Sequence, residues 1–549
     1  DDQRKADLLG DFFSSVFTKE DHIIPTVDRL TDACTGLSDI NFTADLVFRA
    51  INKLKPKTSS GPDGYSSEFL KSTANSISLP LTLLFASSFT TGTMPAIWRT
   101  ATVTPVFKKG VSSDVNNYGP ISLTSCCCKI MEAIVKEQML KYLFVNKLIT
   151  KHQHGFLARR STCSQLIECT NDWSLALNMR NAVDCAYIDF SKAFDSVSHS
   201  KLCIKLAAYG FEGKLLTWIS SFLSDRTQAV RVGKCSSKPL QVISGVPQGS
   251  VIGPLLFLLY INDIANMFGN GISVKLFADD VKIYVTVNNI EDSLVLQSGL
   301  NALFDWSVKW QLNVSANKCL ILQLGSSNKH FVYNINNSVL PNVLEARDLG
   351  ILVDSDLKFN RHICYIATKA HQRASLILRC FKSRDTNMLF KAFITYVRPL
   401  LEYNCQIWSP CYVSLVAKIE SVQRKFTKRL KGFNKLSYPD RLSRLGAESL
   451  QLRRLKLDLV LFYNILHGFV DVDTYSLINL IDTDIVHSRG HSLRIVKQHC
   501  RLNCRSNSFA CRNINAWNSL PDYAVTCKSV VTFKRQISLI DFSKFLIVI

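Results

Sequence analysis

The sequence predicts an α+β fold divided among several structural units. Runs with the strand-like alternation of apolar and other residues occur at 101–107, 186–190 and 272–287, with helical patterns between them. Residues 362–470 instead carry mainly helical, basic and amphipathic patterns. At 549 residues the chain is too long for one ordinary core, and its length suggests about three to four domains or subdomains.

The composition is that of a folded, basic protein. Hydrophobic residues make up 47% of the chain and charged residues 20%, which excludes a disordered protein. The net charge of +21 and the pI of about 9.3 favour a polyanionic partner, and nucleic acid is the commonest one. A basic protein without a special partner is the alternative, but basic residues are more closely spaced in the C-terminal half, as at 424–429. No apolar stretch approaches the roughly 18–20 residues of a membrane span, so we expect no membrane partner.

The 18 cysteines form no regular framework, and no secretory signal is present. This favours reduced, mostly buried thiols in an intracellular protein. A zinc site in the tail is the alternative, but the spacing of its candidate ligands fits no standard pattern. Those candidates are His491, His499, Cys500, Cys504 and Cys511.

Two strand-like runs, 272–277 and 281–287, are joined by a very short link. This arrangement predicts a β-hairpin that carries Asp279 and Asp280 at its tip. Aspartate is a common turn residue, so this pair alone does not indicate catalysis.

A third carboxylate, Asp189, ends the predicted strand 186–190 and precedes a predicted helix. Helix capping is one explanation, but catalytic groups of α/β folds also collect at such strand ends. Three clustered carboxylates repel one another, and Mg²⁺, which prefers few carboxylates plus substrate phosphates, relieves that repulsion. Two such ions can activate a 3′-hydroxyl and stabilise a leaving pyrophosphate, which is the chemistry of templated nucleotidyl transfer.

Two further segments suit a nucleotide. Lys108 and Lys109 end the predicted strand 101–107, where they indicate either a phosphate contact or a solvated strand edge. Residues 244–250 form a tight Gly- and Pro-containing loop before the apolar helix 251–261, either as a plain connection or as backbone donors for an anion.

These motifs together resemble the reverse transcriptases of non-LTR (LINE-type) retrotransposons, most closely the jockey-like branch. Residues 187–195 resemble the family's first catalytic motif, and residues 244–250 resemble its template-and-nucleotide loop. Phe277-Ala278-Asp279-Asp280 resembles the family's signature box. Five flanking blocks match in order: 61–64, 153–156, 348–350, 422–424 and 517–521.

The resemblance implies a right-hand polymerase with fingers, palm and a helical thumb, followed by a basic, mainly helical C-terminal region. The expected divisions are an N-terminal extension at 1–60, fingers and palm at 61–360, a thumb-like region at 361–475 and a C-terminal region at 476–549. The implied activity is RNA-directed DNA synthesis with two Mg²⁺ ions, for which Mn²⁺ can substitute. The implied partners are an RNA template, a DNA primer, the RNA–DNA hybrid and deoxynucleoside triphosphates.

The resemblance also assigns roles to individual residues. Asp189 and Asp279 correspond to the principal catalytic metal ligands, and Asp280 to the auxiliary one. Leu349 and Gly350 correspond to the primer grip. The nucleotide-binding positions are Lys108, Lys109, Phe190, Phe194, Gln248 and Lys318. Among these, Phe194 corresponds to the aromatic that blocks a ribose 2′-hydroxyl, and Lys318 to the lysine that protonates pyrophosphate.

One position departs from the family pattern, which has arginine where this chain has Gly119 in Asn117-Tyr118-Gly119-Pro120-Ile121. The missing arginine is a triphosphate contact, so we expect impaired activity. A non-catalytic nucleic-acid-binding relic is therefore the alternative function, and a maturase-like RNA-binding factor is a third. The chain begins at Asp1 without methionine, so we expect a fragment of a longer polyprotein. We expect action in the nucleus, where integration occurs, or in a cytoplasmic ribonucleoprotein.

Overall fold

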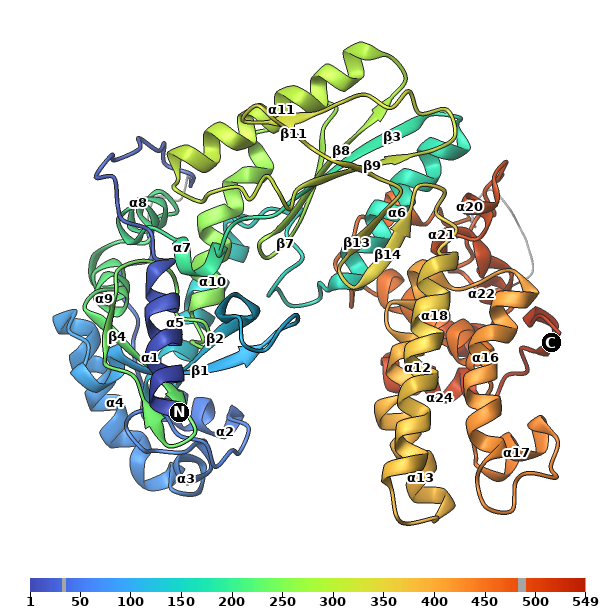
Figure 1. Cartoon of the computed structure of the whole chain (residues 1–549), viewed down its shortest axis with the longest axis horizontal. Coiled ribbons are helices and arrows are strands. Elements are labelled where there is room, and N and C mark those ends of the chain that lie inside the picture. Colours follow the sequence, from blue (N-terminus) through green and yellow to red (C-terminus); the bar gives the residue numbers. More distant parts are fainter. Residues whose placement is uncertain (32–35, 482–489, 549) are drawn as a thin grey trace.

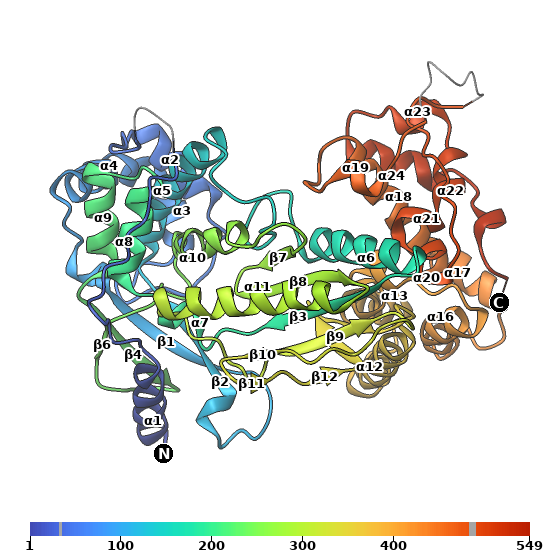
Figure 2. The same cartoon turned by 90° about the horizontal axis from the view of Figure 1, so that it is seen from above.

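The computed structural model describes residues 1–31, 36–481 and 490–548, and within them the chain is a mixture of helices and β-sheets. Two lobes flank a central sheet, so the molecule has the outline of an arch (Figure 1). The N-terminal lobe lies at one end of the long axis and the C-terminal lobe at the other, in both views (Figure 2).

The central sheet has the strand order β12-β9-β3-β8-β7. These strands are β12 (Asn342–Val343), β9 (Leu320–Leu324), β3 (Ala182–Ile188), β8 (Asp280–Val287) and β7 (Ser273–Phe277). Strand β3 is central and antiparallel to both neighbours, and β7 and β8 form the predicted hairpin. The prediction of this hairpin from alternating apolar residues is therefore confirmed.

Each face of the central sheet is covered by one long helix. Alternate side chains of β3 point to opposite faces, as in any strand. Ala186 and Ile188 join the core with α11 (Ile290–Lys309), whereas Val183 and Cys185 join the core with α6 (Thr162–Asn178). Because both faces are covered, the central strand is almost wholly apolar.

A second sheet lies in the N-terminal lobe, with the order β2-β1-β4-β5 and with β6 also paired to β4. Its strands are β1 (Thr100–Phe107), β2 (Tyr118–Leu123), β4 (Arg226–Val232), β5 (Cys235–Ser236) and β6 (Leu240–Val242). The helices of this lobe are α1 (Asp2–Ser15), α2 (Ala44–Lys53), α3 (Ser67–Ser72), α4 (Ala74–Thr91), α5 (Cys126–Val145), α7 (Ala193–Ser196), α8 (His199–Ala208), α9 (Gly213–Leu223) and α10 (Gly253–Ile261).

The mixed polar and apolar sequence of residues 1–50 predicts helix, and this prediction is wrong for the stretch between α1 and α2. The described residues of that stretch form no helix. Pro25 lacks the N–H that a helix interior needs. The segment is instead fixed by side chains, since the Thr18 N–H donates to Ser244 Oγ and the Ser198 hydroxyl donates to Glu20.

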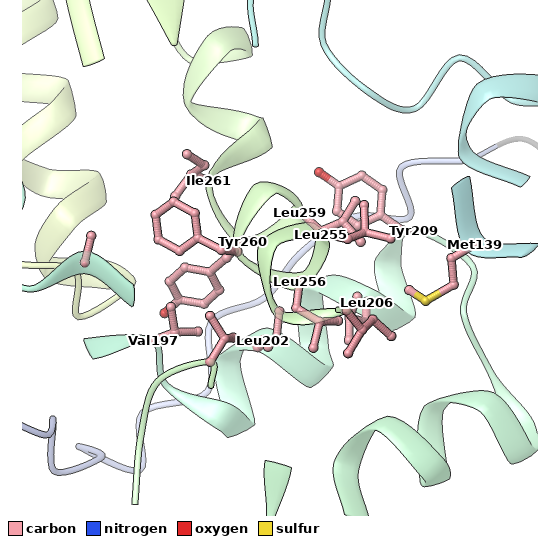
Figure 3. Close-up of a cluster of buried hydrophobic side chains, with 14 of the residues drawn as sticks. Met139, Val197, Leu202, Leu206, Tyr209, Leu255, Leu256, Leu259, Tyr260 and Ile261 are labelled. Atoms are coloured by element: carbon pink, nitrogen blue, oxygen red, sulfur yellow. The ribbon is translucent and has the colours of Figure 1, made fainter. Parts of the chain in front are cut away.

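Helix α10 is buried on all sides, which explains its uninterrupted apolar sequence. Figure 3 shows its side chains, such as Leu256 and Leu259, among residues of α8 and α5 that include Leu202, Leu206 and Met139. This packing fixes the loop 244–250 that leads into α10.

The C-terminal lobe is helical, in agreement with the patterns over 362–470. Its helices are α12 (Asn360–Cys380), α13 (Thr386–Tyr396), α14 (Arg398–Glu402), α15 (Cys405–Trp408), α16 (Val413–Lys428), α17 (Tyr438–Arg444), α18 (Leu450–Leu466), α19 (Thr474–Leu477), α20 (Asn503–Ser506), α21 (Phe509–Arg512), α22 (Ile514–Asn518), α23 (Asp522–Val525) and α24 (Val530–Ser538). Its core is continuous with the α6 face of the central sheet.

A hairpin, β13 (Glu345–Asp348) and β14 (Ile351–Asp354), joins the central sheet to this lobe. The sequence pattern predicts a single strand at about 348–353, and this prediction is wrong because the chain reverses at Leu349 and Gly350. Smaller elements are β10 (Asn334–Ile335), β11 (Ser338–Val339) and the 3₁₀ helices Ala96–Arg99, Val115–Asn117, Asn262–Asn266 and Ser543–Phe545.

The 17 described cysteines are all free thiols, and Cys380 alone among them is exposed. The candidate zinc ligands of the tail lie in the described part, where no three side chains of metal-binding type converge on a common point. Among the described helices, none is both long and apolar enough to cross a lipid bilayer.

Candidate active site

The register of the central sheet places Asp189 beside the tip of the β7–β8 hairpin. Ile188 pairs with Val281, so the next residue along β3, Asp189, comes opposite Asp280. The hairpin closes with Phe277 paired to Asp280, which leaves Ala278 and Asp279 as its two-residue loop. The three predicted catalytic carboxylates are thus delivered to one edge of the sheet by two adjacent strands.

The hairpin loop is held from outside by Gln153. Ala278 has a φ of 53°, which is uncommon for a residue with a side chain. The Gln153 side chain accepts from the Ala278 N–H at 2.9 Å and donates to the Ala278 carbonyl at 3.4 Å. A Cβ at Gly155 would lie 2.4 Å from the Ala278 nitrogen, so only glycine permits this close approach.

The carboxylates of the site interact with one another. Burial, together with the charge of Asp189, raises the pKa of Asp279. Burial, together with the charges of Asp279 and Asp348, raises the pKa of Asp280 to about 6. Raised carboxyl pKa values of this origin are typical of sites that bind a cation or exchange protons.

Lys318 supplies a positive charge to the same site. Its Nζ lies 3.1 Å from Asp189 Oδ2, and both side chains are well exposed to solvent. Ser315 N–H donates to the Asp189 carbonyl at 2.8 Å, so the loop before β9 runs alongside Asp189. The structure therefore brings Lys318 to Asp189.

Two phenylalanines follow Asp189 and have different surroundings. The Phe190 ring is buried against Trp306, so only its backbone can face the site. The half-buried Phe194 ring stacks on Phe257 with centroids 4.1 Å apart and meets the exposed Phe156 edge-on at 6.1 Å. Phe194 is therefore a rigid wall, backed by α10, close after the strand that carries Asp189.

The loop 244–250 is bound to the segment that follows Asp189. Gln248 donates to Asp195 Oδ1 at 2.8 Å, and the Ser244 hydroxyl donates to the Asp195 carbonyl at 2.7 Å. The Gln248 carbonyl accepts from Ser122 N–H of β2 at 2.8 Å. Gln248 thus joins the second sheet to the segment that follows Asp189, and its side chain is already hydrogen-bonded to Asp195.

Of the two predicted lysines, Lys108 reaches the acidic cluster. Burial raises the pKa of both Asp279 and Asp195, and the positive charge of Lys108 offsets part of this increase at each residue. The Lys108 side chain lies over Gly119, where an added Cβ would be 2.4 Å from Lys108 Cε. Lys109 is exposed in the same loop.

Leu349 and Gly350 form the tight turn of the β13–β14 hairpin. Their φ values are 43° and 91°, and two positive values are what a type I′ hairpin turn requires. The hydroxyl of Tyr403, the residue that follows α14, donates to the Leu349 carbonyl at 3.0 Å. The predicted primer grip is thus a rigid turn attached to the C-terminal lobe.

Sequence reasoning missed the roles of Gln153, Lys282 and Tyr403. Lys282 carries a detectable signal, since it is a charged residue inside the otherwise apolar run of β8 and is buried. Gln153 lies in a matched block, 153–156, but nothing local indicates its contact with Ala278. Tyr403 has no local signal.

The comparisons with known proteins agree with this geometry. Residues 106–351 match the family model "Reverse transcriptase (RNA-dependent DNA polymerase)". The chain is 27% identical over 434 residues to the RNA-directed DNA polymerase from mobile element jockey of Drosophila funebris, covering 77% of this chain and 47% of that protein.

Two proteins of Drosophila melanogaster are also similar. The probable RNA-directed DNA polymerase from transposon X-element is 25% identical, covering 71% of this chain and 43% of that protein. The probable RNA-directed DNA polymerase from transposon BS is 27% identical, covering 69% of this chain and 43% of that protein. The chain spans under half the length of each of these relatives. Residues 106–351 thus match the model of a reverse transcriptase domain, and the chain is similar to RNA-directed DNA polymerases of Drosophila mobile elements.

Proposed function

We propose that this chain is an RNA-directed DNA polymerase that copies an RNA template into DNA by two-metal nucleotidyl transfer. The observation that carries the proposal is the register that sets Asp189 opposite Asp280, beside Asp279, inside the matched domain. The alternative of a non-catalytic relic rested on Gly119, and the lysine beside Gly119 weakens it.

The lobes correspond to the parts of a right-hand polymerase in this proposal. The N-terminal lobe with the second sheet acts as fingers, the central sheet as palm, and the helices from α12 to α18 as thumb. The covered sheet is a firm base for the catalytic edge, because both of its faces are packed. The region after residue 476 packs into the same core as the thumb and supports it.

Asp189 and Asp279 are the residues that would hold Mg²⁺, with Asp280 as auxiliary ligand. The donor chemistry fits, because these carboxylates are hard oxygen donors and their mutual repulsion raises the pKa of Asp279 and Asp280 beyond the effect of burial. Among the described residues no three donors converge closely enough to hold one ion, and Lys318 instead neutralises Asp189. When bound, two Mg²⁺ ions, or Mn²⁺ in their place, would activate the primer 3′-hydroxyl and stabilise the charge on the phosphates.

The nucleotide would be held by residues from three directions. Lys108 and Lys109 meet the triphosphate as point charges, and the Phe190 backbone and Gln248 line the site. The Phe194 ring excludes a ribose 2′-hydroxyl, because Phe257 prevents it from withdrawing. Lys318 gives a proton to the departing pyrophosphate.

The template and primer would lie in a groove beside Leu349 and Gly350. A hollow of about 790 Å³ there is lined by cations and by the rings of Tyr365 and Tyr403. The cations are Arg347, Lys369, Arg373 and Arg379. Basic side chains interleaved with aromatic rings suit the backbone and bases of nucleic acid. The nucleus, or a cytoplasmic ribonucleoprotein, is where these substrates would be met.

Primer extension on an RNA template with Mg²⁺ tests the proposal. Asp279→Asn should abolish DNA synthesis and leave the melting temperature within a few degrees, because Asp279 lies in the two-residue loop of the hairpin, outside the ladder of paired strand residues. Asp305→Asn, an exposed carboxylate of α11, is the matched control and should leave synthesis unchanged. An inactive wild-type chain would refute the proposal, and loss of folding in Asp279→Asn would show that this residue is structural.

A further inference from the structure

A second basic surface lies on helices α16 and α17 and on the loop that joins them. It consists of seven exposed cations, and we refer to it as the outer basic surface. Its members are Lys418, Lys425, Lys428, Arg429, Lys431, Lys435 and Arg444.

The charges of the outer basic surface are not neutralised by the protein. Within the described residues, none of the seven cations forms an ion pair, although ion pairs are found elsewhere on the molecule, as between Lys53 and Glu137. Glu420 is buried and accepts from Tyr438 and from backbone N–H groups at the start of α18. Asp440 is the one exposed carboxylate in 413–444, and it is bonded to Ser437. Clustered cations without carboxylate partners repel one another, so a polyanion on this surface relieves that repulsion.

The cations are arranged along a line. Lys418 and Lys425 are seven residues apart in α16, and Arg429, four residues further, is its C-cap with helical backbone angles. The three therefore lie on one face over about 16 Å. A hollow of about 290 Å³ between α12 and α16 is lined by Lys425, Lys428 and Arg429, together with His371 and Ser375. A row of flexible cations along a hollow suits a phosphodiester backbone and offers little for reading bases.

The outer basic surface is separate from the groove beside the primer grip. In both views α12 lies between the N-terminal lobe and α16, so α16 is on the side of α12 turned away from the catalytic edge (Figures 1 and 2). The groove beside Gly350 is formed by α12 with α14, whereas the hollow of the outer surface is formed by α12 with α16.

We propose that the outer basic surface binds single-stranded template RNA that extends beyond the catalytic groove. This inference rests on the proposed function, because the RNA is then the long polyanion that the active site already holds. Tethering by the active site raises the effective concentration of the remaining RNA to the millimolar range, so a few weak phosphate contacts suffice. Duplex DNA bound in place of the RNA is an alternative occupant that the test separates.

The test compares two variants on two substrates. Lys425→Gln/Lys428→Gln/Arg429→Gln removes three cations of the outer surface, and Lys141→Gln/Lys147→Gln/Lys234→Gln removes three exposed cations of the N-terminal lobe as a matched control. Both substrates carry the same primer–template duplex, and one has in addition a single-stranded RNA extension of about 30 nucleotides. Binding is measured by fluorescence anisotropy over a salt series without nucleotide, so a chain that lacks polymerase activity still gives a result. Thermal melts check that both variants are folded.

We expect the wild type and the control to bind the extended substrate about tenfold more tightly than the short one. The outer-surface variant should lose this gain but bind the short substrate normally. On the extended substrate, a plot of the logarithm of the binding constant against the logarithm of the salt concentration should become less steep by about 2. Three cations are removed, and each phosphate contact with a single strand contributes roughly 0.7 to this slope. An equal loss on both substrates would overturn the proposal, because the surface would then belong to the catalytic groove. A retained gain in the outer-surface variant would also overturn it, and a parallel titration with duplex DNA alone that shows weaker binding by this variant would identify DNA as the occupant.

Discussion

Lys282 of β8 and Asp348 of β13 form a buried ion pair that joins the hairpin carrying Asp279 and Asp280 to the hairpin of the predicted primer grip. Lys282 is two residues after Asp280, and Asp348 immediately precedes Leu349. The Tyr187 hydroxyl also donates to Asp348 at 3.1 Å. Burial disfavours the charged ammonium, but Asp348 outweighs this effect and raises the pKa of Lys282.

Breaking this pair should destabilise the protein and loosen the primer. Lys282→Met or Asp348→Asn alone leaves a buried charge without its partner, which costs about 3–5 kcal/mol in the free energy of unfolding. We also expect the KM for primer to rise more than the KM for nucleotide, because the two hairpins lose their fixed relation. Denaturant unfolding and primer extension measure these two effects.

The double variant Lys282→Met/Asp348→Leu tests whether the two residues act as a pair. Replacing both charges by apolar groups is often neutral for stability, so the double variant should be more stable than either single variant. Additive losses would show that Lys282 and Asp348 act independently.

Glu168 of α6 should make the protein sensitive to acid. Its carboxylate lies 2.5 Å from Lys275 Nζ of β7 and 3.4 Å from His154 Nε2, and it accepts from the Asp473 N–H. Burial alone would raise the pKa of Glu168, but His154 and Lys275 outweigh it and lower the pKa to about 2.

Because the pKa of Glu168 is lower in the folded protein than in the unfolded chain, its ionised form stabilises the fold. This stability is fully present at pH values above the unfolded pKa of about 4.5, and it is lost as the pH falls toward 2. The difference corresponds to about 3 kcal/mol at neutral pH, at 1.36 kcal/mol per pKa unit. Glu168→Gln should therefore lower the melting temperature at pH 7 and flatten its dependence on pH between about 5 and 2. An unchanged acid profile in this variant would contradict the assignment.

The elements that the sequence predicts well are those set by local pattern. The β7–β8 hairpin and the strand before Asp189 follow from alternating apolar residues, because these strands are packed on the sheet faces. The relations between distant segments are not predictable in this way. Gln153 is 125 residues from Ala278, and Lys282 is 66 residues from Asp348. Leu349 has a positive φ, which a leucine in the sequence does not indicate. The sequence pattern therefore predicts a continuous strand where the structure has the turn of the predicted primer grip.

Phe194→Ala should let ribonucleotides enter the site. The Phe194 ring is fixed by its stack on Phe257, and its removal opens the space that a 2′-hydroxyl needs. The ratio of ribonucleotide to deoxynucleotide incorporation should rise at least tenfold, in the range that one steric contact supplies. Phe156→Ala removes a ring that touches only the edge of Phe194 and should leave the ratio unchanged. A changed ratio in Phe156→Ala with none in Phe194→Ala would move the steric wall to Phe156.

Gly119→Arg should raise polymerase activity, and the structure shows what the arginine has to displace. Lys108 lies over Gly119, with its Cε 2.4 Å and its Nζ 2.9 Å from the position of an added Cβ. These atoms are the end of a flexible side chain, so Lys108 can turn aside. Arginine adds a fork of donors that matches a phosphate. One charge-assisted hydrogen bond is worth roughly 1.5–3 kcal/mol, which is about 10- to 100-fold in kcat/KM if it acts in the transition state.

Because Lys108 occupies this space, the sharper test uses both positions. Lys108→Ala should lower kcat/KM for the nucleotide, and Gly119→Arg in that background should restore it, since the arginine then meets no obstacle. Gly119→Ala is the matched control, because its Cβ crowds Lys108 without adding a donor and should give no gain. Steady-state kinetics with a deoxynucleotide series show whether the arginine acts in the ground state or in the transition state. A fall in KM alone indicates ground-state binding, and a rise in kcat indicates contact in the transition state. If Gly119→Arg fails to rescue Lys108→Ala, position 119 does not face the triphosphate, and the departure from the family pattern has no consequence for catalysis.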